Sequence, residues 1–215
     1  MSYFNKDFGS SAFVGAGVGY QFNSWFRADI TGEYRLSNDW RWHDSSSWSG
    51  TGYSATGYER TSFGHRAGVV LVNGYFDLGT WYGITPFLGA GVGFVSHSLK
   101  GGTTDTLNVF TYTGGPVIST SSGGTIANKE QTNLAWALHA GLGYDIAPNL
   151  KLEVAYRYLN MGSVRTGVVN CYCSSTYAGF KIKDVESHDI KLGLRWALGG
   201  PAAPAYEPAP LMRKF

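Results

Sequence analysis

The sequence is short of charge, of long apolar runs and of cysteine, and each shortage excludes a class of protein. Charged residues make up 15% of the 215 residues, well below the quarter or so that is usual in soluble domains. The formal net charge is only +2, which leaves no strongly basic surface for nucleic acid. No apolar run reaches the roughly 18 residues of a transmembrane helix. The first residues, Met1 to Lys6, also lack the apolar core of a signal peptide.

Residues that could form a metal or catalytic site are scattered. None of the five histidines forms a close pair with metal-ligand spacing. His97-Ser98 and Ser187-His188 are neighbours on predicted strands, so their side chains point to opposite faces and form no dyad. The spacing Gly-x-Gly-x-Gly at Gly15 differs from the nucleotide-binding pattern, and no helix follows it. We expect no enzyme activity and no cofactor.

The two cysteines, Cys171 and Cys173, form a C-x-C sequence in a polar segment. Two cysteines do not define a metal site, and this spacing closes only a small ring. Free thiols, a local disulfide and an intermolecular link all remain open.

Aromatic residues (15%) and 30 glycines are abundant, and hydrophobic residues alternate strictly with polar ones. Along Phe26 to Leu36 one parity is apolar, while the other consists of Arg, Asp, Thr, Glu and Arg. Leu150 to Tyr158 repeats this pattern. Such alternation predicts β-strands with one apolar and one charged face. In a soluble sandwich the apolar face packs inward, whereas in a membrane barrel it meets lipid and the charges point into the lumen.

Loop lengths favour the membrane barrel. We predict about seven strands, at residues 12–22, 26–36, 62–78, 85–98, 131–146, 150–161 and 186–198. Their connections alternate short and long, with long loops at residues 37–61, 99–130 and 162–185. This alternation is typical of an antiparallel up-and-down transmembrane β-barrel with tight periplasmic turns and long external loops. A lipocalin-like carrier is disfavoured, because its apolar cavity would require the charged residues of each strand to point outward.

An odd number of strands does not suit a bacterial barrel, which usually has an even number. We therefore expect an eighth strand and an export signal upstream of Met1, with unpaired edges along residues 12–22 and 186–198. The barrel would occupy residues 12–198. Residues 1–11 would be an N-terminal loop remnant, and residues 199–215 a Pro/Ala-rich periplasmic tail.

The inward parity predicts a cluster of charges inside the barrel. A lumen of about eight strands is just wide enough for side chains to fill, and buried charges persist when paired. The predicted lumen charges are Arg27, Asp29, Glu33, Arg35, Lys151, Glu153, Arg157, Asp189, Lys191 and Arg195. Inward glycines near Gly15, Gly89 and Gly141 would leave space for them. An aromatic girdle is predicted near the short turns, formed by Phe22, Trp25, Phe26, Trp81, Tyr82 and Trp196.

Several strand sequences resemble a known family. The matching segments are Gly15-Ala-Gly-Val-Gly-Tyr-Gln-Phe22, Phe26-Arg-Ala-Asp29, Asn73-Gly-Tyr-Phe-Asp-Leu-Gly79, Thr85-Pro-Phe-Leu-Gly-Ala-Gly-Val-Gly93 and Asp189-Ile-Lys-Leu-Gly-Leu-Arg-Trp196. The chain is similar to the small outer-membrane β-barrel surface proteins of alphaproteobacteria, the opacity-antigen-like or porin family of Rhizobiales. The resemblance implies an outer-membrane surface protein, and some such relatives are described as haemin-binding or weakly pore-forming. In these relatives the last strand, matched here by Ile190 to Leu198, signals to the assembly machinery.

We therefore expect a structural, surface-exposed barrel whose lumen is plugged by charged side chains. A narrow porin-like channel and binding of haem or another small ligand by the loops remain alternatives. The expected partners are outer-membrane lipid, lipopolysaccharide at the basic and aromatic rim, the outer-membrane assembly machinery and a haem or host ligand at the loops.

Overall fold

A computed structural model describes residues 2–7 and 10–198, with side chains described from residue 10 onward. This part of the chain is built of β-strands. Within it, no helix is long and apolar enough to cross a membrane. The tail predicted at residues 199–215 lies outside the described residues.

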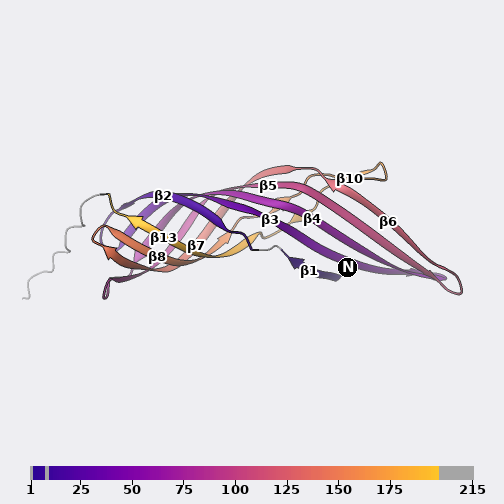
Figure 1. Ribbon diagram of the computed structural model, residues 1–215, viewed down its shortest axis with the longest axis horizontal. Helices are drawn as coiled ribbons and strands as arrows, with labels where there is room; N and C mark the ends of the chain where they lie inside the picture. The colour runs from indigo at the N-terminus through magenta and orange to yellow at the C-terminus, as the bar shows by residue number, and fades with distance from the viewer. Residues whose placement is uncertain (1, 8–9, 199–215) are drawn as a thin grey trace, which may run out of the picture.

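The seven predicted strands are all present in one antiparallel sheet (Figure 1). Neighbouring strands follow the order β2, β3, β4, β5, β7, β8 and β13. Their bounds are β2 (Phe13–Gln21), β3 (Phe26–Gly50), β4 (Tyr53–Asp77), β5 (Ile84–Tyr112), β7 (Lys129–Ala147), β8 (Leu150–Asn160) and β13 (Glu186–Trp196). Each strand pairs with the next along the chain, as expected of an up-and-down arrangement.

Short turns join the strands at one end of the sheet. In the first, Asn23 Oδ1 accepts hydrogen bonds from the backbone N–H groups of Trp25 (3.0 Å) and Phe26 (2.7 Å). In the turn between β4 and β5, Gly79 and Gly83 have φ values of 108° and 79°, a region that glycine enters without steric cost. We call this end the turn end.

The long loops predicted at residues 37–61 and 99–130 are mostly strand, so this prediction is wrong. β3 and β4 stay paired as far as Gly50↔Tyr53, and β5 pairs with β6 (Val117–Ile126) as far as Thr111↔Val117. We call these outer portions, residues 38–64 and 100–126, the extension; it forms the long projecting ribbon in Figure 1. Their Thr, Ser and aromatic residues suit a strand that water surrounds, although their polarity indicated loops.

The N-terminal residues also form a strand instead of the predicted loop. β1 (Ser2–Asp7) pairs with residues 41–45 of β3. It lies along the same edge of β3 as β2, which pairs nearer the turn end. The polar sequence gave no alternation from which this strand could be recognised.

The third predicted loop, residues 162–185, contains four short strands: β9 (Val164–Arg165), β10 (Val169–Cys171), β11 (Thr176–Tyr177) and β12 (Lys181–Ile182). β10 pairs with the extension strand β6, and β12 pairs with β9. Cys171 and Cys173 form a local disulfide. This segment is therefore tied to the main sheet through β10, whereas β9 and β12 form a separate two-stranded sheet.

The two outermost strands have free edges, as predicted. Among the described residues, β2 pairs only with β3, and β13 pairs only with β8. The sheet nevertheless curls round. Arg35 on β3 lies 2.6 Å from Asp189 on β13, although five strand boundaries separate these two strands in the sheet order. The described strands thus form a barrel that is open along one seam.

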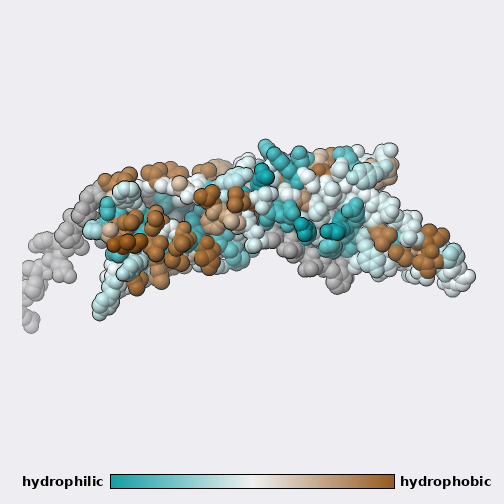
Figure 2. Space-filling model, viewed as in Figure 1, coloured by the Kyte–Doolittle hydropathy of each residue, from teal (hydrophilic) through white to brown (hydrophobic). Residues whose placement is uncertain are grey.

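The curl gives the sheet a charged inner face and an apolar outer face. Ile30, Val154 and Leu192 are 54%, 47% and 75% exposed on the outside. Arg27 and Glu33, on the opposite parity, are buried. Figure 2 shows apolar residues over the barrel, more polar ones over the middle of the molecule, and a small apolar group at the far tip of the extension. The sidedness inferred from alternation is confirmed.

Candidate functional site

Charged side chains from three strands meet inside the barrel in a group that we call the central cluster: Glu33, Arg35, Arg157, Asp189 and Lys191. Arg157 is fully buried and bridges two acids, Glu33 and Asp189, at 2.7 Å each. Arg35 donates to both carboxylate oxygens of Asp189, at 2.9 and 2.6 Å. Lys191 contacts Glu33 at 2.8 Å. Bidentate, charge-assisted contacts of this kind hold their geometry tightly.

A second group, the turn-side cluster, lies nearer the turn end and contains Arg27, Asp77, Glu153 and Arg195. Arg27 lies 3.3 Å from Asp77 and 3.2 Å from Glu153. Arg195 lies 3.2 Å from Glu153 and 4.0 Å from Asp77. These distances are longer than those in the central cluster. The turn-side cluster is therefore the looser of the two.

The structure pairs nine of the ten predicted lumen charges with an opposite charge. Lys151 pairs with Asp145 at 2.7 Å. The tenth, Asp29, accepts a hydrogen bond from Asn73 at 2.7 Å. Asp77 and Asp145 were absent from the predicted cluster. When these two aspartates are included, six basic residues face six acidic residues, whereas the predicted set contains four acidic residues.

Glycines on the inner face make room for these side chains. A Cβ on Gly15 would lie 2.6 Å from Glu33 Cγ, which supports the predicted role of this glycine. A Cβ on Gly89 would meet the Tyr75 ring, and one on Gly141 would lie 2.6 Å from Phe87. These two glycines therefore admit aromatic rings instead of charges. Those rings in turn hold a charge, because the Arg27 guanidinium lies 4.1 Å from the centre of the Tyr75 ring and 4.8 Å from that of Phe87.

On the side of the central cluster away from the turn end, the interior of the barrel is apolar. The sequence did not predict this. We call this group the apolar cap; it comprises Trp40, Phe63, Ala67, Val69, Leu71, Val95, Leu99, Ala135, Ala137, Leu159, Met161, Val164 and Val185. Val164 and Val185 come from the segment predicted to be an external loop, yet both are buried. The predicted set of lumen charges thus leaves out this apolar half of the interior.

Two histidines lie beneath the cap. His65 and His97 share a hydrogen bond of 2.9 Å between ring nitrogens, and the other nitrogen of His97 lies 3.2 Å from the Met161 carbonyl oxygen. The Trp40 ring stacks on His65 with 4.1 Å between centroids. These contacts give a hydrogen-bond partner to both ring nitrogens of His97 and to Nε2 of His65. In the described part of the chain, no group of three or more His, Cys, Asp or Glu could hold a metal ion.

Five of the six residues predicted for the aromatic girdle are exposed at the turn end: Phe22, Trp25, Trp81, Tyr82 and Trp196. Phe26 is partly covered. Trp25 stacks on Phe76 of β4 with 5.8 Å between centroids, and Phe76 also contacts Phe26 at 5.3 Å. Their arrangement on the outer surface, next to an apolar band, is the one that interfacial aromatic residues adopt.

Comparison with known proteins identifies a family and several similar proteins. The model of a family described as "Outer membrane protein beta-barrel domain" matches residues 2–197. A Rickettsia bellii protein that carries the name "Putative adhesin" is 29% identical over 195 residues, which covers 87% of this chain and 75% of its own length. An uncharacterized Brucella abortus protein is 32% identical over 204 residues, covering 86% and 68%. The crystal structure of Neisserial surface protein A aligns with a TM-score of 0.40 at 16% identity, over 87% of this chain and 99% of that one.

Proposed function

The chain belongs to the outer-membrane β-barrel family, and from this premise we propose that it is a closed anchor that presents its extension to the surroundings of the cell. The barrel holds the protein in the outer membrane. Its interior is blocked by ion pairs and by the apolar cap. The extension and the segment at residues 162–185 form the contact surface.

The observation that carries the plug is the environment of Arg157. This side chain is fully buried and is held by acids from β3 and β13, two strands that lie far apart in the sheet order. An ion passing through would have to displace pairs at 2.6–2.8 Å, and buried charges that lose a partner are strongly destabilised. The apolar cap closes the same interior a second time, since water and ions are excluded from a packed apolar region.

Planar-bilayer recording of the natural full-length protein tests the plug. We expect no conductance steps at voltages where a general porin, reconstituted in parallel, gives steady ones. Steady single-channel steps from the wild-type protein would contradict the plug and favour a narrow channel.

The names of the Rickettsia relatives support a role in attachment, and the geometry of the extension suits it. The hairpins β3–β4 and β5–β6 pair side by side in one sheet. This sheet projects from the barrel, so its tip lies far from the membrane band (Figure 2). Phe110 contacts Trp48 and Tyr53 there, with ring centroids 6.1 and 6.5 Å away, and Trp48 is 40% exposed. Solvent-exposed aromatic residues are common at binding surfaces.

Attachment is tested by expressing the full-length protein in a non-adherent bacterium and counting bacteria bound to host cells. Ser119→Cys in the extension and Asn149→Cys in a short turn give a matched topology control. A membrane-impermeant maleimide should label the first in intact cells and the second only after permeabilisation. If Ser119→Cys is labelled on the surface but adherence stays at the level of cells without the protein, the attachment role is wrong.

A further inference from the structure

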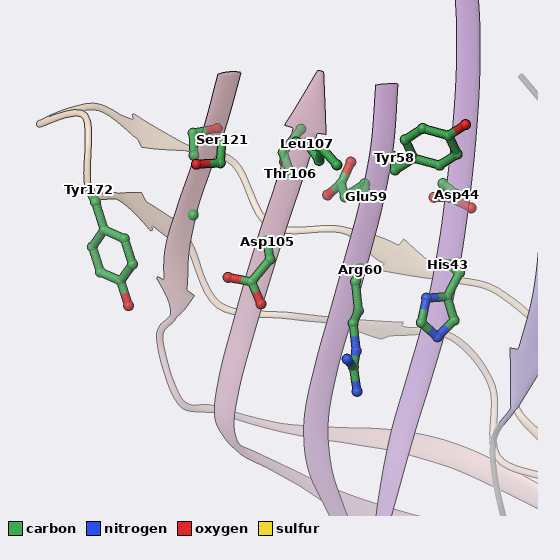
Figure 3. A pocket seen from close by; sticks show the side chains of 12 residues that line it. His43, Asp44, Tyr58, Glu59, Arg60, Asp105, Thr106, Leu107, Ser121 and Tyr172 are labelled. Carbon is green, nitrogen blue, oxygen red and sulfur yellow. The ribbon is translucent and has the colours of Figure 1, made fainter. Parts of the chain in front are cut away.

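The outer face of the extension contains a groove formed by four strands and the turn after β10. Its cavity volume is about 570 Å³. One row across the sheet is His43, Arg60, Asp105 and Gly123, which are register partners on β3, β4, β5 and β6. The next row contains Tyr58, Leu107 and Ser121. Figure 3 shows Arg60 between His43 and Asp105, with Tyr172 beyond Asp105.

Two of the charged groups in this groove, Arg60 and Asp105, take no part in the ion pairs and hydrogen bonds of the described part of the chain. Glu59, also in the groove, accepts a hydrogen bond from Thr104 at 3.1 Å. Arg60 and Asp105 are direct partners across β4 and β5, yet within the described residues neither side chain has an ion pair or a hydrogen bond. Both side chains are exposed. By contrast, every charge of the central cluster is paired. A guanidinium and a carboxylate are thus available side by side to a molecule in the groove.

Two tyrosines border the same space. Tyr58 is 52% exposed and Tyr172 is 74% exposed. Gly123 has no side chain beside Asp105, and a Cβ built there would lie 3.4 Å from the Tyr172 ring. The Tyr172 N–H donates to the Gly123 carbonyl at 2.9 Å, and the disulfide between its two neighbours, Cys171 and Cys173, closes the turn. The backbone of Tyr172 is therefore held at the edge of the groove.

We propose that this groove binds the end of an uncharged saccharide. Adjacent sugar hydroxyls match a guanidinium that donates and a carboxylate that accepts, each through two parallel hydrogen bonds. The C–H face of a sugar ring packs on a tyrosine, which offers an apolar ring together with a polar tip. The volume lies within the roughly 300–1,000 Å³ of small-molecule sites. A fully apolar ligand would leave both charges without partners, and an anionic one would be repelled by Asp105.

This inference rests on the proposed function, because it needs the extension outside the cell. The test measures binding directly, on full-length protein in detergent, with immobilised lactose, maltotriose and mannotriose as neutral probes. The 3′-sialylated and sulfated derivatives of lactose serve as anionic probes. We expect the wild type to bind at least one neutral probe, and we expect Asp105→Asn and Tyr172→Ala each to weaken that binding at least tenfold.

Two control variants match these changes. Tyr177→Ala removes another exposed tyrosine of the same segment, and Arg66→Gln changes an exposed arginine on the same face of β4 outside the groove. Neither should change the affinity more than twofold. The proposal is overturned if no neutral probe binds the wild type better than it binds the Tyr58→Ala/Asp105→Asn/Tyr172→Ala variant. Binding of the anionic probes alone would overturn it too.

The failures of the two proposals are distinguishable. If a neutral saccharide binds through Asp105 and Tyr172 but cells do not adhere, attachment is wrong and the groove stands. If cells adhere equally well with Asp105→Asn and no saccharide binds, the groove is wrong and attachment stands. A Cys171→Ser/Cys173→Ser variant should weaken saccharide binding less than Tyr172→Ala does, because the hydrogen bond from Tyr172 to Gly123 remains.

Discussion

Strands β3, β4 and β5 run through both the barrel and the extension, and their pairing is antiparallel throughout, but their outer faces differ. On β4 the outer face of the barrel half carries exposed Val70, Val72 and Phe76. The extension half of the same face carries Arg60 and Ser62, with Tyr58 beyond them. Since backbone pairing is common to both halves, the outward side chains decide which solvent each half faces. From the change from apolar to polar along β4, we assign the membrane boundary to the stretch between Val70 and Ser62.

The barrel half and the extension half also differ in how their charged side chains are paired. In the barrel the sheet curls on itself and buries Arg157 completely, so every charge nearby is held by a partner. In the extension, Arg60 and Asp105 lie on an exposed face, where water stabilises an unpaired charge. Charges in the barrel are therefore held in ion pairs, whereas Arg60 and Asp105 in the extension have no such partner among the described residues.

The largest expected effect comes from removing the most buried charge. Arg157→Ala leaves Glu33 and Asp189 buried with fewer partners, and removal of one member of a buried ion pair costs about 3–5 kcal/mol. Arg60→Ala in the extension should change the free energy of unfolding by less than about 0.5 kcal/mol, as is usual for surface sites. Urea unfolding of the full-length protein from lipid vesicles measures both. Equal effects of the two changes would contradict the contrast between paired and free charge.

The next effect concerns the outer faces. Val72→Arg puts a charge on the band that we assign to lipid, where an arginine costs about 2–4 kcal/mol near the bilayer midplane. Ser62→Arg is the matched change on the same face of β4 in the extension, and its cost should be near zero. Both variants are compared in the same vesicle unfolding assay and by heat-modifiable migration on gels. A cost of several kcal/mol for Ser62→Arg would move the membrane boundary beyond residue 62.

Much of the barrel could be predicted because its strands carry a strict two-residue period. The faces of residues 26–36 and 150–158 follow directly from alternation, and the structure places Ile30 and Val154 outside and Arg27 and Arg157 inside. Short turns could be recognised from pairs such as Asn23-Ser24 between apolar strands. The prediction of unpaired edges on β2 and β13 followed from counting strands, and the pairing confirms it.

The other features could not be predicted because local sequence patterns do not show which residues meet across long distances in the chain. Asp77 lies at the end of a strand where Val69-Val70-Leu71-Val72 obscures the alternation, so its inward direction was hidden. The apolar cap uses Val164 and Val185, which look like isolated apolar residues in a polar segment until the segment folds back. The sequence of the extension predicted loops, because polar strands that face water on both sides show little hydrophobic periodicity.

The smallest expected effects concern the turns at the two ends of these strands. Asn23→Ala removes the acceptor of two turn N–H groups and should lower the free energy of unfolding by about 1 kcal/mol, the usual worth of a hydrogen bond.

Gly52, with φ of 83° at the far end of the extension, would be strained by a side chain to a similar extent. Gly52→Ala should nevertheless leave the unfolding midpoint unchanged, because exposed hairpin ends open locally without unfolding the rest. Hydrogen exchange should instead show faster opening confined to residues 45–58. If Gly52→Ala lowers the midpoint as much as Asn23→Ala does, the extension and the barrel unfold as one cooperative unit.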